Sequence, residues 1–355
     1  MKRNTTKKDV IGCDLGDKKS ELCVLDAAGT VTLQTSVRTK PEEMREFFSA
    51  RPSATVVIEV GTHSRWVREL LMELGHRVIV ANARRVQLIS QNDSKHDRKD
   101  AELLARLGRA DPALLAPLEH RSMDAQADLA VAKVRDGLVA TRTRLVNQAR
   151  GLVKSFGARL PKCSSESFHR KTTVSVPAAL KAALDPIYTL LDQIEKQIKA
   201  LDKTIERIAK KHPDVEIISQ PSGVGTLTAL VYLLTLEDKT RFKQSRLAGA
   251  FVGLRPKQDQ SGDSDKQLRI TKAGDGMLRR LLVLSANYIL GPLGPDSDLR
   301  RWGLALAERG GKNAKKRAAV AVARKLAVLL HRLWVTGEVY QPLGYGQKGS
   351  TVSSP

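Results

Sequence analysis

The N-terminal third of the chain alternates short apolar runs with turns and helical patterns, and this order strongly constrains the fold. The apolar runs cover residues 9–15, 21–26, 30–37, 54–60 and 76–81. Polar turns join the first three runs, which predicts consecutive antiparallel strands. Helical patterns that begin at Pro41 and Thr62 precede the last two runs, which predicts parallel addition to the same sheet. We therefore expect an α/β domain with a mixed sheet in the order of a ribonuclease H-like fold.

Four acidic residues accompany these elements. Asp14 ends the first apolar run, and Glu59 lies near the end of the fourth. Asp97 and Asp100 lie three residues apart at the start of a helical pattern over 97–105. Carboxylates from two strand ends and one helix face are able to converge on one or two Mg²⁺ ions, which stabilise the attacking and leaving oxygens of a phosphoryl transfer. The same acids also fit turn residues or a solvated helix face, so the spacing alone leaves both interpretations open.

The chain carries a large positive excess, with 60 Lys and Arg against 38 Asp and Glu and a formal charge of +22. Such an excess favours a polyanionic partner, because cations release counterions from phosphates; an anionic membrane surface is the competing polyanion. No stretch approaches ~18 apolar residues, and no apolar signal core follows the N-terminal charges. The cysteines, Cys13, Cys23 and Cys163, lack metal-ligand spacing and fit a reducing compartment. We therefore expect a cytoplasmic, nucleoid-associated protein without membrane contact.

The middle of the chain predicts two long antiparallel helices that form a coiled coil. Apolar residues follow a rhythm of three and four over 131–152 and a cleaner heptad seam over 187–208. A polar, basic segment at 157–177 separates the two patterns and is expected to form a loop at the tip. The seam is able to close within one chain or between chains.

The C-terminal part predicts a mostly helical domain. The Gly-x-Gly turn at 221–226, ahead of an apolar helix at 227–236, resembles a helix-hairpin-helix turn, whose N–H groups can hold a phosphate; a tight interhelical turn fits equally well. The further elements are expected at 247–252 (helix), 255–270 (polar hairpin), 276–290 and 313–334 (helices). The predicted domains are residues 1–120, 121–212 and 213–340, followed by a disordered tail at 341–355.

Ser261 is a candidate nucleophile, because Gly262 follows it and places its hydroxyl on an open turn. Basic residues surround it in the sequence and are candidates for nucleic-acid binding: Arg255, Lys266, Arg269, Lys272, Arg279 and Arg280. Cations around a serine hydroxyl stabilise the charge of a phosphoryl transition state. A surface serine in a hairpin turn is the simpler interpretation of this pair taken alone.

Taken in order, the motifs resemble the DEDD-type transposases of the Piv-like insertion-sequence family, some of which are guided by a bridge RNA. The motifs that carry the resemblance are Ile11-Gly-Cys-Asp-Leu-Gly16, Val57-Ile-Glu59, Lys95-His-Asp-Arg-Lys-Asp-Ala101, Pro221-Ser-Gly-Val-Gly225, Gly253-Leu-Arg-Pro256, Ser261-Gly262 and Ile270-Thr-Lys-Ala-Gly-Asp-Gly-Met-Leu-Arg279. They span nearly the whole chain. Ser222 departs from the family pattern, which more often has glycine after the proline.

This resemblance implies a RuvC-like N-terminal domain and a serine-containing transposase domain. Asp14, Glu59, Asp97 and Asp100 fall on the family's acidic tetrad, which holds Mg²⁺, and Ser261 falls on its serine nucleophile. The expected function is site-specific DNA recombination through a covalent phosphoserine intermediate, on donor and target DNA, with a structured guide RNA, by a homo-oligomer (dimer or tetramer). The alternatives are a metal-dependent Holliday-junction nuclease that uses water and a non-catalytic nucleic-acid scaffold. An actin-like ATPase is disfavoured because a second phosphate motif is missing.

Overall fold

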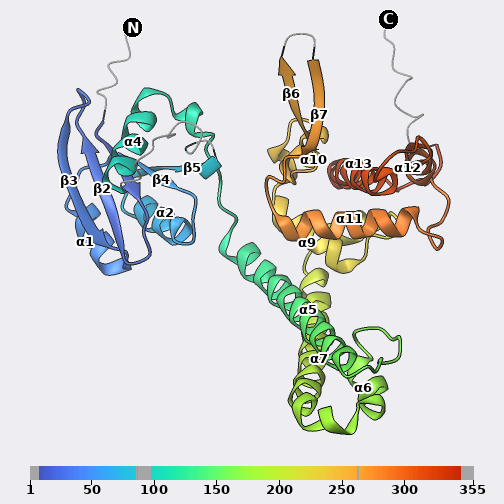
Figure 1. Cartoon of the computed structure of the whole chain (residues 1–355). Helices are drawn as coiled ribbons and strands as arrows, with labels where there is room; N and C mark the ends of the chain where they lie inside the picture. The colour runs from blue at the N-terminus through green and yellow to red at the C-terminus, as the bar shows by residue number, and fades with distance from the viewer. Residues whose placement is uncertain (1–7, 85, 87–96, 262–263, 345–355) are drawn as a thin grey trace, which may run out of the picture. The chain divides into compact units, whose positions relative to one another are not determined.

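The computed structural model describes residues 8–84, 86, 97–261 and 264–344, with only the backbone described at 259, 261 and 264–267. The chain divides after residue 120 into two compact units (Figure 1). Lys95, His96 and Gly262 of the sequence motifs, the side chain of Lys266, and residues 345–355 of the predicted tail lie outside the described parts. No helix among the described residues is long and apolar enough to cross a membrane.

The N-terminal unit contains a five-stranded mixed sheet in the order β3-β2-β1-β4-β5. Its strands are β1 (Val10–Asp14), β2 (Lys19–Leu25), β3 (Val31–Arg38), β4 (Thr55–Glu59) and β5 (Arg77–Ala81). The first three pair antiparallel, whereas β4 runs parallel to both β1 and β5. The predicted mixed α/β sheet is therefore confirmed.

Helices cover both faces of this sheet. On one face, α1 (Pro41–Ser49) and α2 (Ser64–Glu73) pack their buried Met44 and Leu71 against Ile11. On the other, α4 (Asp97–Ala110) packs its buried Leu104 against Val10, and the short helix η1 (Pro112–Leu115) follows it. The sheet is thus the middle layer of the unit, with separate apolar clusters above and below.

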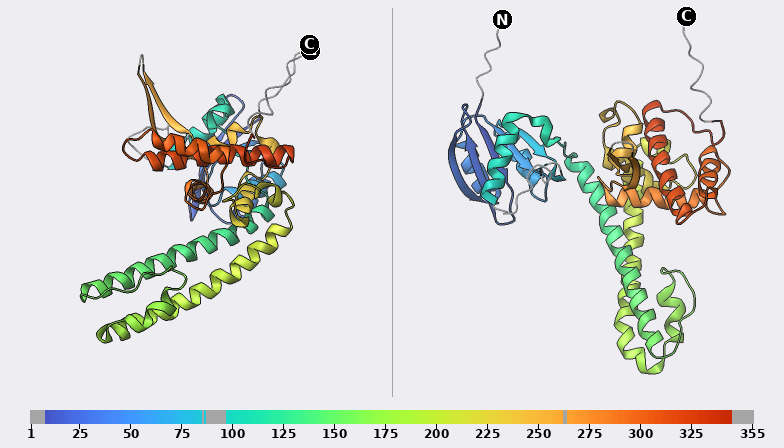
Figure 2. Two further views of the ribbon diagram at one scale, coloured as in Figure 1. Left: turned by 90° about the vertical axis from the view of Figure 1, so that its right-hand side faces the viewer. Right: turned by 45° about the horizontal axis from the view of Figure 1, so that its top comes forward.

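The C-terminal unit begins with two long antiparallel helices, α5 (Met123–Ser155) and α7 (Lys181–Lys210), which lie side by side (Figure 2). Their direction follows from two ion pairs: Arg135 Nε lies 2.5 Å from Asp202 Oδ1, and Arg142 Nη1 lies 2.6 Å from Glu195 Oε2. The seam residue Ile198 is buried, and the seam of α7 packs on α5 of the same chain.

The segment predicted as a loop between these helices contains short helical pieces, which corrects that expectation. They are α6 (Phe168–Thr172), η2 (Thr173–Ser175) and η3 (Ala178–Leu180). Phe168 is fully buried and stacks on Tyr188 of α7, with ring centroids 5.7 Å apart. Leu160, Val176 and Leu180 are buried in the same cluster, so several apolar anchors fold the segment back onto the helix pair.

The remainder of this unit is mostly helical, as predicted. Its elements are α8 (Asp214–Ile218), α9 (Thr226–Leu236), η4 (Lys239–Arg241), α10 (Arg246–Phe251), β6 (Pro256–Ser261), β7 (Ser264–Ile270), α11 (Gly276–Leu290), α12 (Asp298–Glu308) and α13 (Ala314–Thr336). Helix α9 is buried along nearly its whole length, in one core with residues of α5, α7, α11 and α13. The hairpin β6–β7 projects from these helices (Figure 1).

The first residues of the predicted tail contact α12. The backbone N–H of Asp298 donates to the carbonyl of Pro342 at 2.9 Å, and the N–H of Gly344 donates to Asp298 Oδ2 at 2.8 Å. Two hydrogen bonds to the first turn of α12 hold this short segment on the C-terminal unit.

Candidate active site

The alternation of side chains along β1 and β4 directs two of the predicted acids toward α4. Val10 and Val57 face α4, whereas Ile11 and Ile58 face the opposite cluster. Successive strand residues point to opposite faces, so residues separated by an even number share a face. Asp14 therefore shares the face of Val10, and Glu59 shares that of Val57. Both stand at the carboxyl ends of adjacent parallel strands, one residue beyond the last paired residues of the ladder.

Gly12 lets α4 approach β1 closely. A Cβ at Gly12 would lie 1.9 Å from the carbonyl oxygen of Ala101 and 2.6 Å from the backbone nitrogen of Ala105. Only glycine leaves this space free, because the neighbouring atoms belong to the helix backbone and cannot rotate away. On the same face of α4, a Cβ at Gly108 would lie 2.3 Å from Cγ2 of the Val57 side chain. These two contacts set the helix directly on the sheet beside the end of β1.

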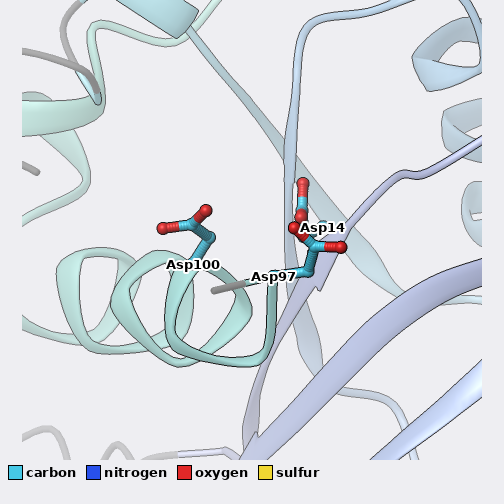
Figure 3. Close-up of side chains that lie close together, drawn as sticks. All are labelled: Asp14, Asp97 and Asp100. Atoms are coloured by element: carbon cyan, nitrogen blue, oxygen red, sulfur yellow. The ribbon is translucent and has the colours of Figure 1, made fainter. Parts of the chain in front are cut away.

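Three of the four predicted acids come together at this contact. One carboxylate oxygen from each of Asp14, Asp97 and Asp100 lies within 4.8 Å of the other two. Figure 3 shows the three side chains, one from the end of β1 and two from the first turn of α4. Asp14 and Asp100 are half-buried and Asp97 is exposed. Glu59 shares their face of the sheet but is not a member of this close group.

The three-acid cluster fits a divalent cation with a preference for oxygen ligands. Carboxylates this close repel one another, and a bound cation removes that repulsion. The exposed side of Asp97 leaves room for water or a phosphate oxygen in the coordination shell, as Mg²⁺ sites require. Cys13 shares the face of Ile11, so its sulfur lies on the other side of the sheet. The cluster therefore offers an all-oxygen ligand set, which suits a hard divalent cation.

An ion pair that no sequence pattern had indicated lies at the edge of this cluster. Glu21 lies directly opposite Asp14 in the antiparallel pairing of β1 and β2, so the two side chains share a face. Its Oε2 lies 3.5 Å from Nε of Arg98, which stands between Asp97 and Asp100 on α4. The pair ties the first turn of α4 to β2. No motif signals it, because a lone Glu in an alternating strand looks like an ordinary solvent-facing residue.

Ser261, the predicted nucleophile, ends β6 at the far end of the hairpin. Its backbone pairs with Ser264, whereas Pro256 pairs with Ile270 at the base. Along the described side chains the hairpin is polar and mostly exposed, with Leu268 49% accessible. The serine therefore stands on a two-stranded arm that is separate from the apolar core of its unit.

The base of the arm is locked by close backbone contacts. Gly253 has φ 73° and a Cβ there would lie 2.1 Å from the carbonyl oxygen of Ala273. Nη1 of Arg279 donates to the carbonyls of Val252 and Ala273, at 3.1 and 2.9 Å. The two motifs on either side of the hairpin thus pack against each other and hold its base in one position.

The other predicted cations fall into two groups. Arg279 and Arg280 are engaged inside the unit, Arg280 through an ion pair of 2.5 Å with Asp136 on α5. Arg269 and Lys272 are exposed near the base of the arm. Arg255 is also exposed and donates to Gln258 at 3.4 Å. The exposed group is accessible to a polyanion, whereas Arg279 supports the fold and Arg280, itself exposed, is paired with Asp136.

The Gly-x-Gly turn lies between α8 and α9, as predicted, and its first glycine serves packing. Gly223 has φ 88°, and a Cβ there would lie 2.8 Å from the Tyr288 ring of α11. The N–H of Val224 closes the turn by donating to the carbonyl of Pro221 at 3.0 Å. These contacts match the simpler interpretation of a tight interhelical turn.

Comparison with known proteins gives the class of this chain. A family model described as a transposase matches residues 11–157, which include the three-acid cluster. A second model, of the transposase IS116/IS110/IS902 family, matches residues 215–292, which include the arm. The two models match separate parts of the chain, and both describe transposases.

Curated relatives are similar to this chain along nearly its whole length. The transposase for insertion sequence element IS1111A of Coxiella burnetii is 29% identical over 349 residues, covering 96% of this chain and 94% of the relative. The transposase for insertion sequence element IS1328 of Yersinia enterocolitica is 28% identical over 337 residues, covering 93% and 98%. The chain therefore belongs to the IS110-type family of insertion-sequence transposases, which confirms the resemblance seen in the motifs.

Proposed function

We propose that this transposase cleaves and rejoins DNA strands as a site-specific recombinase, with the acids of the N-terminal unit as metal ligands and Ser261 as nucleophile. The observation that carries the proposal is the convergence of Asp14, Asp97 and Asp100 in the segment that the DEDD-type model matches. In this interpretation the N-terminal unit is RuvC-like, and its sheet order supports that assignment.

The four carboxylates of Asp14, Glu59, Asp97 and Asp100 are proposed to hold one or two Mg²⁺ ions. A bound Mg²⁺ supplies charge stabilisation to the oxygens of a phosphoryl transfer. The chain's own contribution is to fix the ligands: two come from strand ends and two from the first turn of one helix. Glu59 completes the set from β4, and its place beside Asp14 at the carboxyl end of the sheet supports this role.

Ser261 is proposed to attack a DNA phosphate through its hydroxyl oxygen. A bond forms between that oxygen and phosphorus, the bond to the leaving strand breaks, and the leaving oxygen takes a proton. The phosphoserine ester preserves the phosphodiester bond energy, so strands rejoin without a nucleotide cofactor. The place of Ser261 at the end of β6, far from the base of the arm, supports the role, because a DNA phosphate must reach it.

A structured guide RNA and a homo-oligomer complete the proposal. The charge of +22 supports binding to the phosphates of nucleic acids, RNA as well as DNA. Such proteins recognise a folded RNA through its phosphates and shape, while base pairing selects the DNA sequence. If nuclease treatment of the protein preparation leaves site-specific recombination unchanged, guidance by RNA is wrong.

Ser261→Ala tests the nucleophile directly. Wild-type protein with labelled donor DNA should yield a protein–DNA adduct on a denaturing gel, with the label mapped to Ser261. The variant should lose both the adduct and recombination while it retains Mg²⁺ binding. Ser264→Ala, on the paired residue of β7, is the matched control and should keep the adduct. Continued cleavage by Ser261→Ala with free ends would assign the reaction to water and favour the junction nuclease.

A further inference from the structure

The C-terminal unit contains a cavity of about 950 Å³. One face of α13 forms its floor, and α10, the start of β6 and residues 340–342 form its walls. We refer to this cavity as the α13 groove. Its residues come from α10, the start of β6, the start of α12, α13 and residues 340–342, so no single motif points to it.

Five cations line the α13 groove: Arg246, Arg255, Arg324, Lys325 and Arg332. Arg332 has a carboxylate partner, Glu338, at 3.1 Å. Within the described parts of the chain, neither Arg246 nor Arg324 has a carboxylate within 4.0 Å. The acid in the lining, Asp298, accepts a hydrogen bond from the backbone N–H of Gly344. The groove therefore carries a local excess of positive charge.

This excess is built into the helix geometry. Arg324, Val328 and Arg332 follow one another at intervals of four, so they form one row on α13. The stem of Arg324 lies against Gly249 of α10, where a Cβ would be 3.1 Å from its Cγ. Burial, and then the charge of Arg324, lower the pKa of Lys325. Like charges are held side by side by packing, an arrangement that an anion stabilises.

The groove combines these cations with an apolar floor of Leu247, Val328 and Leu329. A phosphodiester strand offers both complements, a row of phosphates for the cations and sugar or base surface for the floor. The groove includes Gln258 on β6, and Ser261 lies three residues further along that strand, roughly 10 Å at ~3.3 Å per residue. That distance corresponds to about three nucleotides at ~3.4 Å each.

We propose that the α13 groove binds the phosphodiester backbone of a nucleic-acid strand, with Arg246 and Arg324 as its main phosphate contacts. The proposal rests on the proposed function for its ligand class. It concerns binding alone, however, so it is measured without Mg²⁺ and without cleavage. Loss of groove binding and loss of strand chemistry are therefore separate results.

The test uses the full-length chain carrying Arg246→Ala and Arg324→Met. Methionine keeps the stem that packs on Gly249 and removes only the charge. Lys199→Ala with Lys203→Ala, exposed positions on α7, is the control that removes the same number of charges from the same unit. Labelled DNA strands and a folded RNA from the DNA flanking the gene are titrated by fluorescence anisotropy at several salt concentrations, and thermal unfolding checks the fold.

The groove variant should bind at least one probe about 10-fold more weakly than the control variant. The slope of log affinity against log salt should fall by about 2, one for each phosphate contact removed. Weaker binding of DNA would identify the groove's ligand as the strand presented toward Ser261, and weaker binding of RNA would identify it as the guide. Either outcome supports phosphodiester binding in the α13 groove. Equal affinities of the groove variant and the control for every probe would overturn the proposal.

Discussion

The acidic cluster of the N-terminal unit stands on packed elements, whereas Ser261 stands at the end of an exposed two-stranded arm. Asp14 and Asp100 are held where α4 touches β1 through backbone contacts at Gly12. Among the described residues of the arm, such contacts lie at its base, at Gly253 and Gly274. The difference fits the two roles that we propose: metal ligands must stay in fixed geometry, and a nucleophile must reach a large substrate. Segments with few buried contacts open at lower free-energy cost, so mobility is expected in the arm and rigidity in the cluster.

The largest effect is expected from Asp14→Asn. Loss of a charged ligand should reduce strand cleavage at least ~10³-fold, because metal-ion stabilisation contributes several kcal/mol and each ~1.4 kcal/mol is a factor of ten. Cleavage of labelled donor DNA in Mg²⁺ measures it. Asp17→Asn, whose side chain is 92% exposed, is the matched control and should stay active. A fully active Asp14→Asn would show that the cluster is not the metal site.

Gly12→Ala should disturb the packing of α4 on β1 that holds the acidic cluster. The new methyl group meets the backbone of α4, so the helix must move away from β1 and carry Asp97 and Asp100 with it. We expect a loss of stability of about 3 kcal/mol, the upper part of the overpacking range. Thermal unfolding measures the loss, and Mg²⁺ titration should show weaker binding. Gly61→Ala, where a Cβ meets nothing within 4 Å, should change neither. Unchanged Mg²⁺ binding in Gly12→Ala would mean that helix contact does not set the ligand geometry.

Gly253→Ala should weaken the base of the arm instead. A residue with a side chain is strained at φ 73° by roughly 1–2 kcal/mol, and the methyl group also approaches Ala273. Formation of the protein–DNA adduct should fall, while Mg²⁺ binding by the N-terminal acids stays as in the wild type. Gel analysis of the adduct beside a Mg²⁺ titration separates the two effects. An equal loss of metal binding would show that the arm and the acidic cluster are coupled.

The smallest effects are expected at the ion pair beside the cluster. Glu21→Gln leaves the positive charge of Arg98 unbalanced near the three acids, so Mg²⁺ binding should weaken by about 2- to 10-fold. Arg98→Gln leaves the carboxylate of Glu21 unbalanced, so binding should strengthen by a similar factor. Isothermal titration at low ionic strength measures both, with Lys99→Gln, exposed on the same turn, as control. Weakening in both variants would show that the pair acts by holding α4 in position rather than by charge.

Local sequence patterns predicted much of this protein. The strands of the mixed sheet follow from apolar alternation, and the seam of α7 from its heptads, because both depend on residues close in sequence. The position of Asp14 at a strand end and of Asp97 in a first helical turn follow in the same way. The helices α8 and α12 escaped prediction: α8 has only five residues, and α12 is an amphipathic helix whose pattern was overlooked. The segment between α5 and α7 was mistaken for a loop because a few scattered apolar residues, among them Phe168 and Val176, organise it without any periodic pattern.

The tertiary structure decided which of these residues meet. Only packing shows that α4 approaches β1 at Gly12. It also brings Asp14 together with Asp97 and Asp100 in one close group, without Glu59. In the same way, it brings Arg98 to Glu21. The α13 groove likewise exists only where segments some 90 residues apart come together, from α10 to the residues after α13. Periodicity tells which face of an element is buried, but not which other element covers it. That choice depends on shape and charge between residues distant in the chain, and the sequence expresses it in no local pattern.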